Sequence, residues 1–251
     1  MTRNARDFTA LARSLSHTDG GAARRVIVVE SRGRGRSGRA PGSTYTAPQE
    51  LDDLIRALDA WGVRTAQFVG TSRGGLLTML LAMHEGERIE RAVLNDIGPT
   101  IDRSGLARIA AGVGTHMRHA SYEALADHLY KVQRSQFPRM ARAKWLRFAE
   151  QLASPTEDGG VTLDYDPALA DNVRGYTPAD PAPDFWRAFA MLRDKPLLVI
   201  RGAHSDLLSA ATVEAMRRRH GNLRTLIIPD EGHAPLLWDR LAIETIKSFL
   251  A

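Results

Sequence analysis

The sequence of 251 residues contains no cysteine, only four lysines and few aromatic side chains. The lack of cysteine excludes disulfides and thiolate metal sites. No apolar run is long enough to cross a bilayer, and the first residues, Met-Thr-Arg-Asn-Ala-Arg-Asp, lack the apolar core of a signal peptide. We therefore expect a cytoplasmic protein with no membrane partner.

Arginine makes up almost all of the basic residues, and the formal net charge is +5. Such a bias also occurs on surfaces that bind nucleic acid. Here, however, the arginines are spread along the chain and interleaved with 29 acidic residues. We expect no nucleic-acid partner, and steep salt-dependent retention on DNA would contradict this expectation.

The most informative motif is Gly-x-Ser-x-Gly at Gly70, Ser72 and Gly74. An apolar strand is predicted before it, over residues 65–69, and an apolar helix after it, over residues 74–84. A serine at such a strand-to-helix corner is typical of the nucleophile elbow of serine hydrolases. The tight turn forces the serine backbone into a sparsely allowed region, so the positions two residues either side should lack side chains. Gly70 and Gly74 meet that requirement.

A nucleophilic serine needs a base, and His233 is the best candidate among the eight histidines. It lies in Glu-Gly-His-Ala-Pro, a glycine-flanked loop after a strand predicted over residues 225–228. By contrast, His116, His119 and His128 lie in a different segment and lack a convincing set of metal-ligand partners. We expect no metal site.

The base needs an acid to orient its ring, and two aspartates compete for this role. Asp206 follows a strand predicted over residues 197–200, and the order Ser72, Asp206, His233 is that of α/β-hydrolases. Asp96 also follows a predicted strand end, next to the strand before Ser72. We favour Asp206 and keep Asp96 as the alternative acid.

A glycine-rich loop with Gly33, Gly35 and Gly38 matches the letters of a dinucleotide-binding fingerprint. That fingerprint must open directly into a helix, whereas here Pro-Gly-Ser follows and the next helix is predicted to begin near residue 47. A flexible loop after a strand is the better interpretation. We expect no cofactor.

Strands and helices alternate along most of the chain, which predicts a parallel sheet covered on both faces. Residues 101–192 break this alternation, because their pattern is helical with no convincing strand. They predict a cap inserted into a core made of residues 1–100 and 193–251. The predicted helices cover residues 4–15, 48–61, 74–84, 210–220 and 236–250, and the strands cover residues 26–29, 65–69, 92–95, 197–200 and 225–228.

Taken together, these motifs resemble the α/β-hydrolase family, in particular its small cap-bearing members. Those include carboxylesterases, enol-lactonases, carbon-carbon hydrolases of ring-cleavage products and cofactor-free haloperoxidases. The resemblance rests on the elbow, the Gly-x-x-Ser-Asp stretch ending at Asp206, the Gly-His loop at His233 and Arg-Gly-x-Gly-x-Ser from Arg32 to Ser37. It implies a mostly parallel sheet of about five remaining strands, with helices on both faces and a helical cap.

One departure from the family pattern concerns the start of the chain. The family begins with a hairpin and a third strand that ends in a His-Gly or Pro-Gly oxyanion loop, and this chain begins at the following helix. We expect an N-terminally truncated fold in which Met1 is an internal methionine. The strand at residues 26–29 should then shift inward, or something else should fill the gap beside residues 65–69.

The resemblance implies a serine hydrolase acting on a small carboxylic ester or lactone through an acyl-enzyme. The backbone N–H of Arg73 should be one oxyanion donor, and the other should belong to the missing loop, which would weaken activity. The Arg73 side chain either attracts a substrate carboxylate or, more simply, pairs with a nearby acid. Carbon-carbon bond hydrolysis is the alternative activity, and a noncatalytic hydrolase-like protein is the alternative of a different class.

Overall fold

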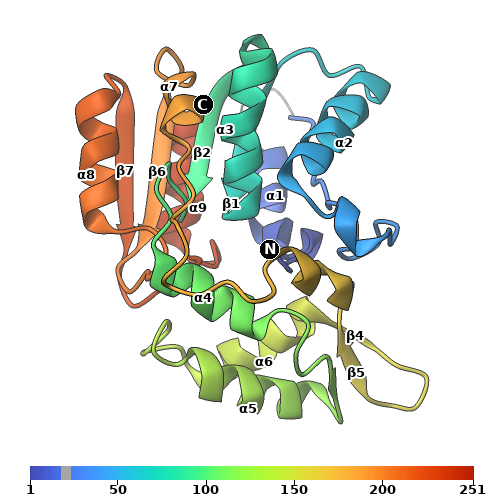
Figure 1. Cartoon of the computed structure of the whole chain (residues 1–251). Helices are drawn as coiled ribbons and strands as arrows, with labels where there is room; N and C mark the ends of the chain where they lie inside the picture. Colours follow the sequence, from blue (N-terminus) through green and yellow to red (C-terminus); the bar gives the residue numbers. More distant parts are fainter. Residues whose placement is uncertain (18–23) are drawn as a thin grey trace.

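A four-stranded parallel sheet forms the centre of the structure, a computed structural model that describes residues 1–17 and 24–251. In spatial order the strands are β1 (Ala66–Thr71), β2 (Ile89–Asn95), β6 (Leu197–Gly202) and β7 (Leu223–Ile228). All three neighbouring pairs are parallel. The predicted α/β fold class is therefore confirmed, because these apolar strands alternate with helices along the chain (Figure 1).

Helices cover both faces of the sheet because successive side chains of each strand point to opposite sides. Leu94 and Val199 pack into one apolar cluster, whereas Val93 and Leu198 pack into another. The first cluster is covered by α2 (Ala47–Ala60), α3 (Arg73–Glu85), α7 (Trp186–Ala190) and α8 (Ala210–Arg219). The second is covered by α1 (Thr9–Ser16) and α9 (Arg240–Leu250).

Short polar residues define where the helices begin. Thr46 accepts a hydrogen bond from the Gln49 N–H at the start of α2, and Asp239 accepts one from the Ala242 N–H at the start of α9. Such caps satisfy backbone donors that have no partner inside the helix. The last helix was predicted from residue 236, but it begins four residues later, after the Asp239 cap. Short 3₁₀ turns occur at Ala5–Phe8, Gly42–Thr44, Gly86–Arg88 and Pro167–Asn172.

The strand predicted at residues 26–29 does not form. The segment has no regular secondary structure and belongs to no sheet, and Ile27 and Val29 are 37% and 45% exposed. Among the described residues β1 pairs only with β2, and a wide cleft separates its other edge from residues 24–31. Neither of the two expected outcomes occurs here, since the segment does not reach β1 and no described strand fills the gap.

A second lobe lies beyond one end of the sheet (Figure 1). It contains α4 (Arg103–Gly112), α5 (Tyr122–Gln133), α6 (Arg142–Leu152) and a small antiparallel sheet in the order β3 (Arg118–His119), β5 (Val161–Leu163), β4 (Ala153–Pro155). We call this lobe the cap. The prediction that this segment contains no strand is wrong. Strands of two to three residues are too short to show the alternation of apolar and polar residues by which strands are predicted.

The aromatic residues of the predicted insertion divide between two places. Phe137, Trp145 and Phe148 are buried in the apolar core of the cap. Trp186 and Phe189, in α7, pack instead into the main core against the sheet. The end of the predicted insertion thus lies on the core, and the division at residues 101–192 stays a prediction.

Candidate active site

Four loops follow the carboxyl ends of the parallel strands. They meet at the end of the sheet that faces the cap (Figure 1). Ser72 follows β1, Asp96 follows β2, Asp206 lies in the loop after β6, and His233 lies in the loop after β7. In open α/β sheets, ligands bind outside the carboxyl ends of the strands. The topology alone therefore brings the predicted site residues together at the carboxyl ends of the strands.

Ser72 occupies a strained corner, as the motif predicted. Its φ is 50° and its ψ −112°, and it directly precedes α3. Positive φ at a residue other than glycine is uncommon, and residues held in sparsely allowed regions cluster at active sites. A side chain on Gly70 would lie 2.4 Å from the Gly75 nitrogen, so this position requires glycine.

Packing also requires a second glycine at the elbow. This glycine is Gly75, not Gly74. A Cβ at Gly74 would meet nothing within 4 Å, whereas a Cβ at Gly75 would lie 2.4 Å from Ile97 Cγ2. The expectation that Gly74 must lack a side chain is wrong, because this residue faces open space. Gly75 instead lets α3 approach the loop after β2.

His233 connects Ser72 to a carboxylate. Its Nε2 lies 2.9 Å from Ser72 Oγ, and its Nδ1 lies 2.8 Å from Asp96 Oδ2. Asp96 is completely buried, and the His233 side chain is 8% exposed. These contacts form an uninterrupted chain from hydroxyl to imidazole to carboxylate.

Asp96 is held rigidly for its contact with His233. The Gly202 N–H donates to its Oδ1 over 2.8 Å, and the Ser205 hydroxyl donates to its Oδ2 over 2.6 Å. The Gly-x-x-Ser-Asp stretch after β6 therefore contributes Gly202 and Ser205 as donors to the neighbouring acid. Its own Asp206 does not contact His233.

The Asp206 carboxylate is bound by Arg108 of α4 instead. Arg108 Nε and Nη2 donate to its two oxygens over 2.6 and 2.8 Å. Burial opposes the charged form of Asp206, but the Arg108 hydrogen bonds and charge outweigh burial and lower its pKa. The geometry thus favours the alternative acid, Asp96, over the preferred Asp206, and it makes Asp206 a link between core and cap.

Burial lowers the pKa of His233, and the Asp96 hydrogen bond opposes this effect only in part. The imidazole is therefore neutral at neutral pH, as a general base must be. Arg73 is the first residue of α3, so its N–H has no acceptor within the helix. Its role as an oxyanion donor stays a prediction. The second donor, which the family resemblance places in an upstream loop, stays a prediction.

Sequence reasoning did not identify Gln136, a buried residue in the cap loop after α5. Its Oε1 accepts the His233 backbone N–H over 2.8 Å. A Cβ at Gly232 would lie 2.1 Å from the same oxygen, so the glycine before His233 allows the close approach. A lone glutamine in a polar loop carries no pattern that could have revealed this contact.

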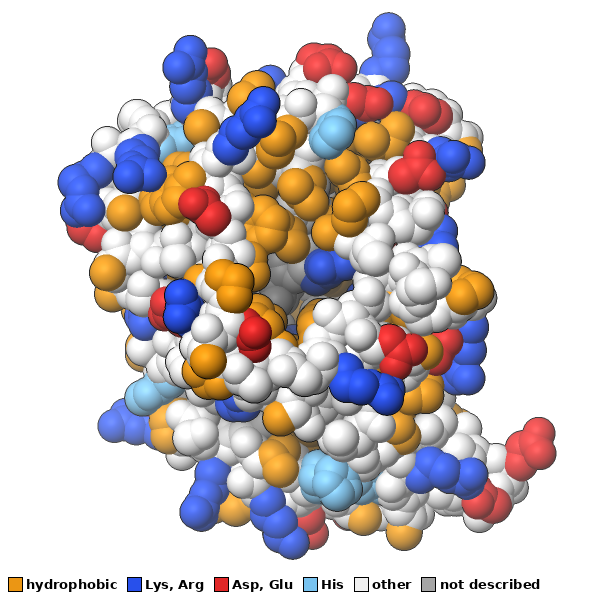
Figure 2. Space-filling view, in the orientation of Figure 1, with side chains coloured by type: hydrophobic (Ala, Val, Ile, Leu, Met, Phe, Trp, Pro, Cys, Tyr) orange, Lys and Arg blue, Asp and Glu red, His pale blue; other side chains and the backbone are white. Residues whose placement is uncertain are grey.

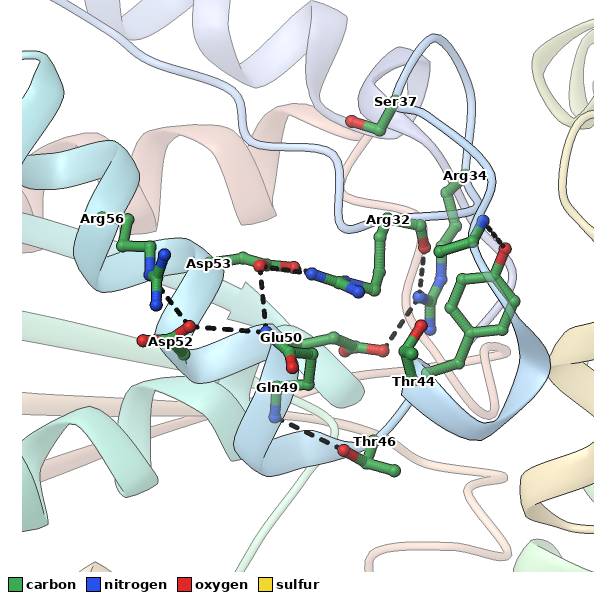
Figure 3. Close-up of polar contacts among 12 residues, drawn as sticks. Arg32, Arg34, Ser37, Thr44, Thr46, Gln49, Glu50, Asp52, Asp53 and Arg56 are labelled. Carbon is green, nitrogen blue, oxygen red and sulfur yellow. Dashed lines mark hydrogen bonds and ion pairs between the residues drawn. The ribbon is translucent and has the colours of Figure 1, made fainter.

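The Arg73 side chain pairs with an acid, which was the simpler of its two expected roles. Its Nε lies 2.9 Å from Glu50 Oε2, and Arg34 Nη1 lies 2.9 Å from Glu50 Oε1. Figure 3 shows Glu50 of α2 turned toward Arg34, beside the separate pair of Arg32 and Asp53. The Glu50 side chain is completely buried. Its carboxylate is shared by two arginines.

The glycine-rich loop packs against the cap rather than opening into a helix. The Gly35 N–H donates to the Asp164 carbonyl, and the Gly33 carbonyl accepts from the Asp166 N–H. Gly33 and Gly35 have φ of 72° and 53°, and side chains there would strike Tyr45 and Glu30. The loop thus has a structural role in closing one side of the site.

A cleft of about 1810 Å³ contains Ser72 and His233 and continues along β1. Its lining includes the apolar side chains of Leu77, Ile109 and Leu129. Figure 2 shows a hollow on one face of the molecule, ringed by hydrophobic side chains and with a basic side chain at depth. The cleft is large enough for a small-molecule substrate with both acyl and alcohol parts.

Three cap histidines lie close together near this cleft. The rings of His116 and His119 lie 4.7 and 5.1 Å from that of His128. Burial lowers the pKa of His128, and the two neighbouring rings and Lys131 lower it further. Within residues 1–17 and 24–251, no group of three or more histidine or acidic side chains has the geometry to hold a metal ion.

No helix in the described part of the chain has both the length and the apolar character needed to span a bilayer.

The fold and this site together define an α/β-hydrolase, and the chain belongs to the alpha/beta hydrolase family, whose model matches residues 3–241. It is 33% identical to a 3-hydroxybutyrate-oligomer hydrolase from Cupriavidus necator, over 99% of this chain and 85% of that protein. It is 26% identical to a 2-(acetamidomethylene)succinate hydrolase from Mesorhizobium japonicum, over 83% and 71% of the two chains. The crystal structure of an alpha/beta hydrolase from Novosphingobium aromaticivorans superposes with a TM-score of 0.90 at 38% identity, covering 99% of this chain and 85% of that one.

Proposed function

We propose that the protein is a serine hydrolase that cleaves a small carboxylic ester or lactone through an acyl-enzyme. The contact of His233 with both Ser72 Oγ and Asp96 carries this proposal. A serine, a histidine and a buried carboxylate in this sequence of contacts perform acyl transfer on several unrelated folds. Membership of a hydrolase family and the name of the Cupriavidus necator relative, a 3-hydroxybutyrate-oligomer hydrolase, also support it.

In the proposed mechanism, neutral His233 takes the proton of Ser72 as the oxygen attacks the substrate carbonyl. Asp96 keeps the proton of the ring on Nδ1 and stabilises the imidazolium that forms. The Arg73 N–H donates to the oxyanion, and His233 then protonates the leaving alcohol. Water, activated by the same histidine, attacks the acyl-enzyme and releases the acid.

Covalent labelling with a fluorophosphonate probe tests this proposal directly. We expect the probe to modify Ser72, identified by mass spectrometry of the labelled peptide. Labelling should be absent in Ser72→Ala and strongly reduced in His233→Ala, and turnover of an activated ester should fall about 10⁶-fold in either variant. A folded protein that never reacts at Ser72 would instead support the noncatalytic alternative.

Carbon-carbon bond hydrolysis remains the alternative activity. It differs from ester hydrolysis in its substrate, so the discriminating assay compares 4-nitrophenyl acetate with a vinylogous diketone acid. We expect the ester to be the better substrate by kcat/KM. Faster turnover of the diketone acid would replace the ester proposal with the carbon-carbon one.

A further inference from the structure

Two arginines near Ser72 share one carboxylate. Glu50 is the carboxylate shared by Arg34 and Arg73, and it carries one negative charge against two positive ones. Two other arginines of the cleft wall each have an acid of their own, since Arg32 pairs with Asp53 and Arg108 with Asp206. In the parts of the chain that the structure describes, no ion pair brings a second acid to Arg34 or Arg73.

Arg73 is the more exposed of these two arginines and faces the cleft more openly. Arg34 is 3% exposed, and it donates to the Met1 and Arg32 carbonyls as well as to Glu50. Arg73 is 23% exposed and lines the cleft together with Ser72. Its Nε is bonded to Glu50 and its Nη2 to the Tyr45 carbonyl over 3.3 Å, whereas no bond joins its Nη1 to another described residue.

The charges of Arg34 and Arg73 disfavour each other. Burial lowers the pKa of Arg34, and the charge of Arg73 lowers it further, although Glu50 opposes both effects. A further cation is thus unfavourable at this place, and an anion is favourable. The start of α3 adds positive potential, because its backbone N–H groups point toward the same space.

We propose that Arg73 binds a carboxylate of the substrate, so that the substrates are small esters that also carry a free acid group. This inference rests on the proposed function, because it places the carboxylate relative to the ester that Ser72 attacks. Ser72 and Arg73 are adjacent in the chain and line the same cleft, so the proposal places the ester and the carboxylate on one small substrate. Guanidinium groups bind carboxylates in a planar, directional geometry that also fixes the orientation of the ligand.

Two nearly isosteric esters test the proposal, 3-acetoxybutyrate with one negative charge and 3-acetoxybutyramide with none. We expect the wild-type protein to prefer the carboxylate, measured as kcat/KM from released acetate. Arg73→Met should lower kcat/KM for the carboxylate about 10- to 100-fold, the effect expected for losing a hydrogen bond to a charged group. The loss for the amide should be smaller, so the ratio of the two kcat/KM values should fall, and Arg73→Lys should restore part of the preference.

Matched variants separate charge recognition from general damage. Arg73→Met leaves Glu50 paired with Arg34, so the buried carboxylate keeps a partner. Arg32→Met removes an arginine of the same cleft wall whose charge is already balanced by Asp53. We expect it to affect both esters equally. Equal loss on both esters in Arg73→Met would overturn the proposal.

A binding measurement makes the outcome independent of catalysis. Ser72→Ala should bind 3-acetoxybutyrate more tightly than the amide by calorimetry, and adding Arg73→Met should remove the difference. Equal binding of the two would overturn the carboxylate site even if Ser72 were labelled by a fluorophosphonate. Absence of labelling and of turnover, with selective binding retained, would overturn the proposed function and leave the carboxylate site standing.

Discussion

At the scale of single residues, the site depends on which groups touch His233. The ring has one carboxylate partner, Asp96, and Asp206 lies near enough for His233 to contribute to its lowered pKa while Arg108 holds it. Chain order predicted Asp206, and it could not show that the Asp206 carboxylate would turn toward α4. The decisive facts are contacts between elements that lie about a hundred residues apart, which a linear pattern does not contain.

Replacement of the two aspartates separates their roles. Asp96→Asn removes the group that fixes the tautomer of His233 and stabilises its charged form, so kcat/KM should fall about 10⁴-fold. Asp206→Asn should reduce it less than tenfold, because its carboxylate is bound to Arg108 rather than to the ring. Steady-state kinetics with one activated ester measure both. The reverse order would restore Asp206 as the acid.

The pH dependence follows from the lowered pKa of His233. Burial shifts this pKa below the ordinary 6.5, so the ring stays neutral and active until the pH falls through that lower value. We expect the acid limb of a kcat/KM profile to lie below pH 6.5, with activity constant just above it. Asp96→Asn should move the limb further down, because Asp96 is the group that raises the pKa. A limb at or above pH 6.5 would contradict this expectation.

At the scale of elements, the continuous apolar strands of the main sheet could be predicted from the sequence. Strand formation that depends on a pairing partner could not. Strands β1, β2, β6 and β7 were predicted within a few residues of their bounds, because buried parallel strands are apolar throughout. Residues 26–29 have the same composition but no ladder partner, and propensity alone does not form a strand. The cap strands of two to three residues exist only because they pair with one another.

The two adjacent glycines at the start of α3 provide a stability test with an internal control. In Gly75→Ala the new Cβ would collide with Ile97 Cγ2, and we expect the free energy of unfolding to fall by about 1–3 kcal/mol. In Gly74→Ala the methyl group enters open space on a helix, so stability should be unchanged or rise by up to about 1 kcal/mol. Urea unfolding of both variants measures the difference. A larger loss in Gly74→Ala would show that the elbow packs differently.

At the scale of the whole molecule, the cap and the core share the site. Gln136 of the cap accepts the His233 backbone N–H, and Arg108 of α4 holds Asp206 of the core. The cap is therefore joined to the loop of the proposed base as well as covering the cleft.

Gln136→Ala tests this connection. It leaves the His233 N–H without its acceptor, so we expect kcat to fall about tenfold with KM little changed. Gln136→Glu keeps an acceptor oxygen and should restore most of the activity. Gln133→Ala serves as the control, because Gln133 is a nearby glutamine of the cap that lines the cleft and whose side chain has no bond to His233. Equal losses in both alanine variants would show that the bond between Gln136 and the His233 N–H does not account for the effect.

The open edge of β1 has a consequence for the behaviour of the protein in concentrated solution. An edge strand presents unpaired backbone groups that can template pairing with another chain, and proteins often guard such edges with charged side chains. Arg24 lies across this edge, bonded to the Gln67 side chain and to the Leu250 carbonyl. We expect Arg24→Val to raise the aggregation rate in light scattering at fixed protein concentration. The arginine-rich composition would then contribute to colloidal stability at this edge.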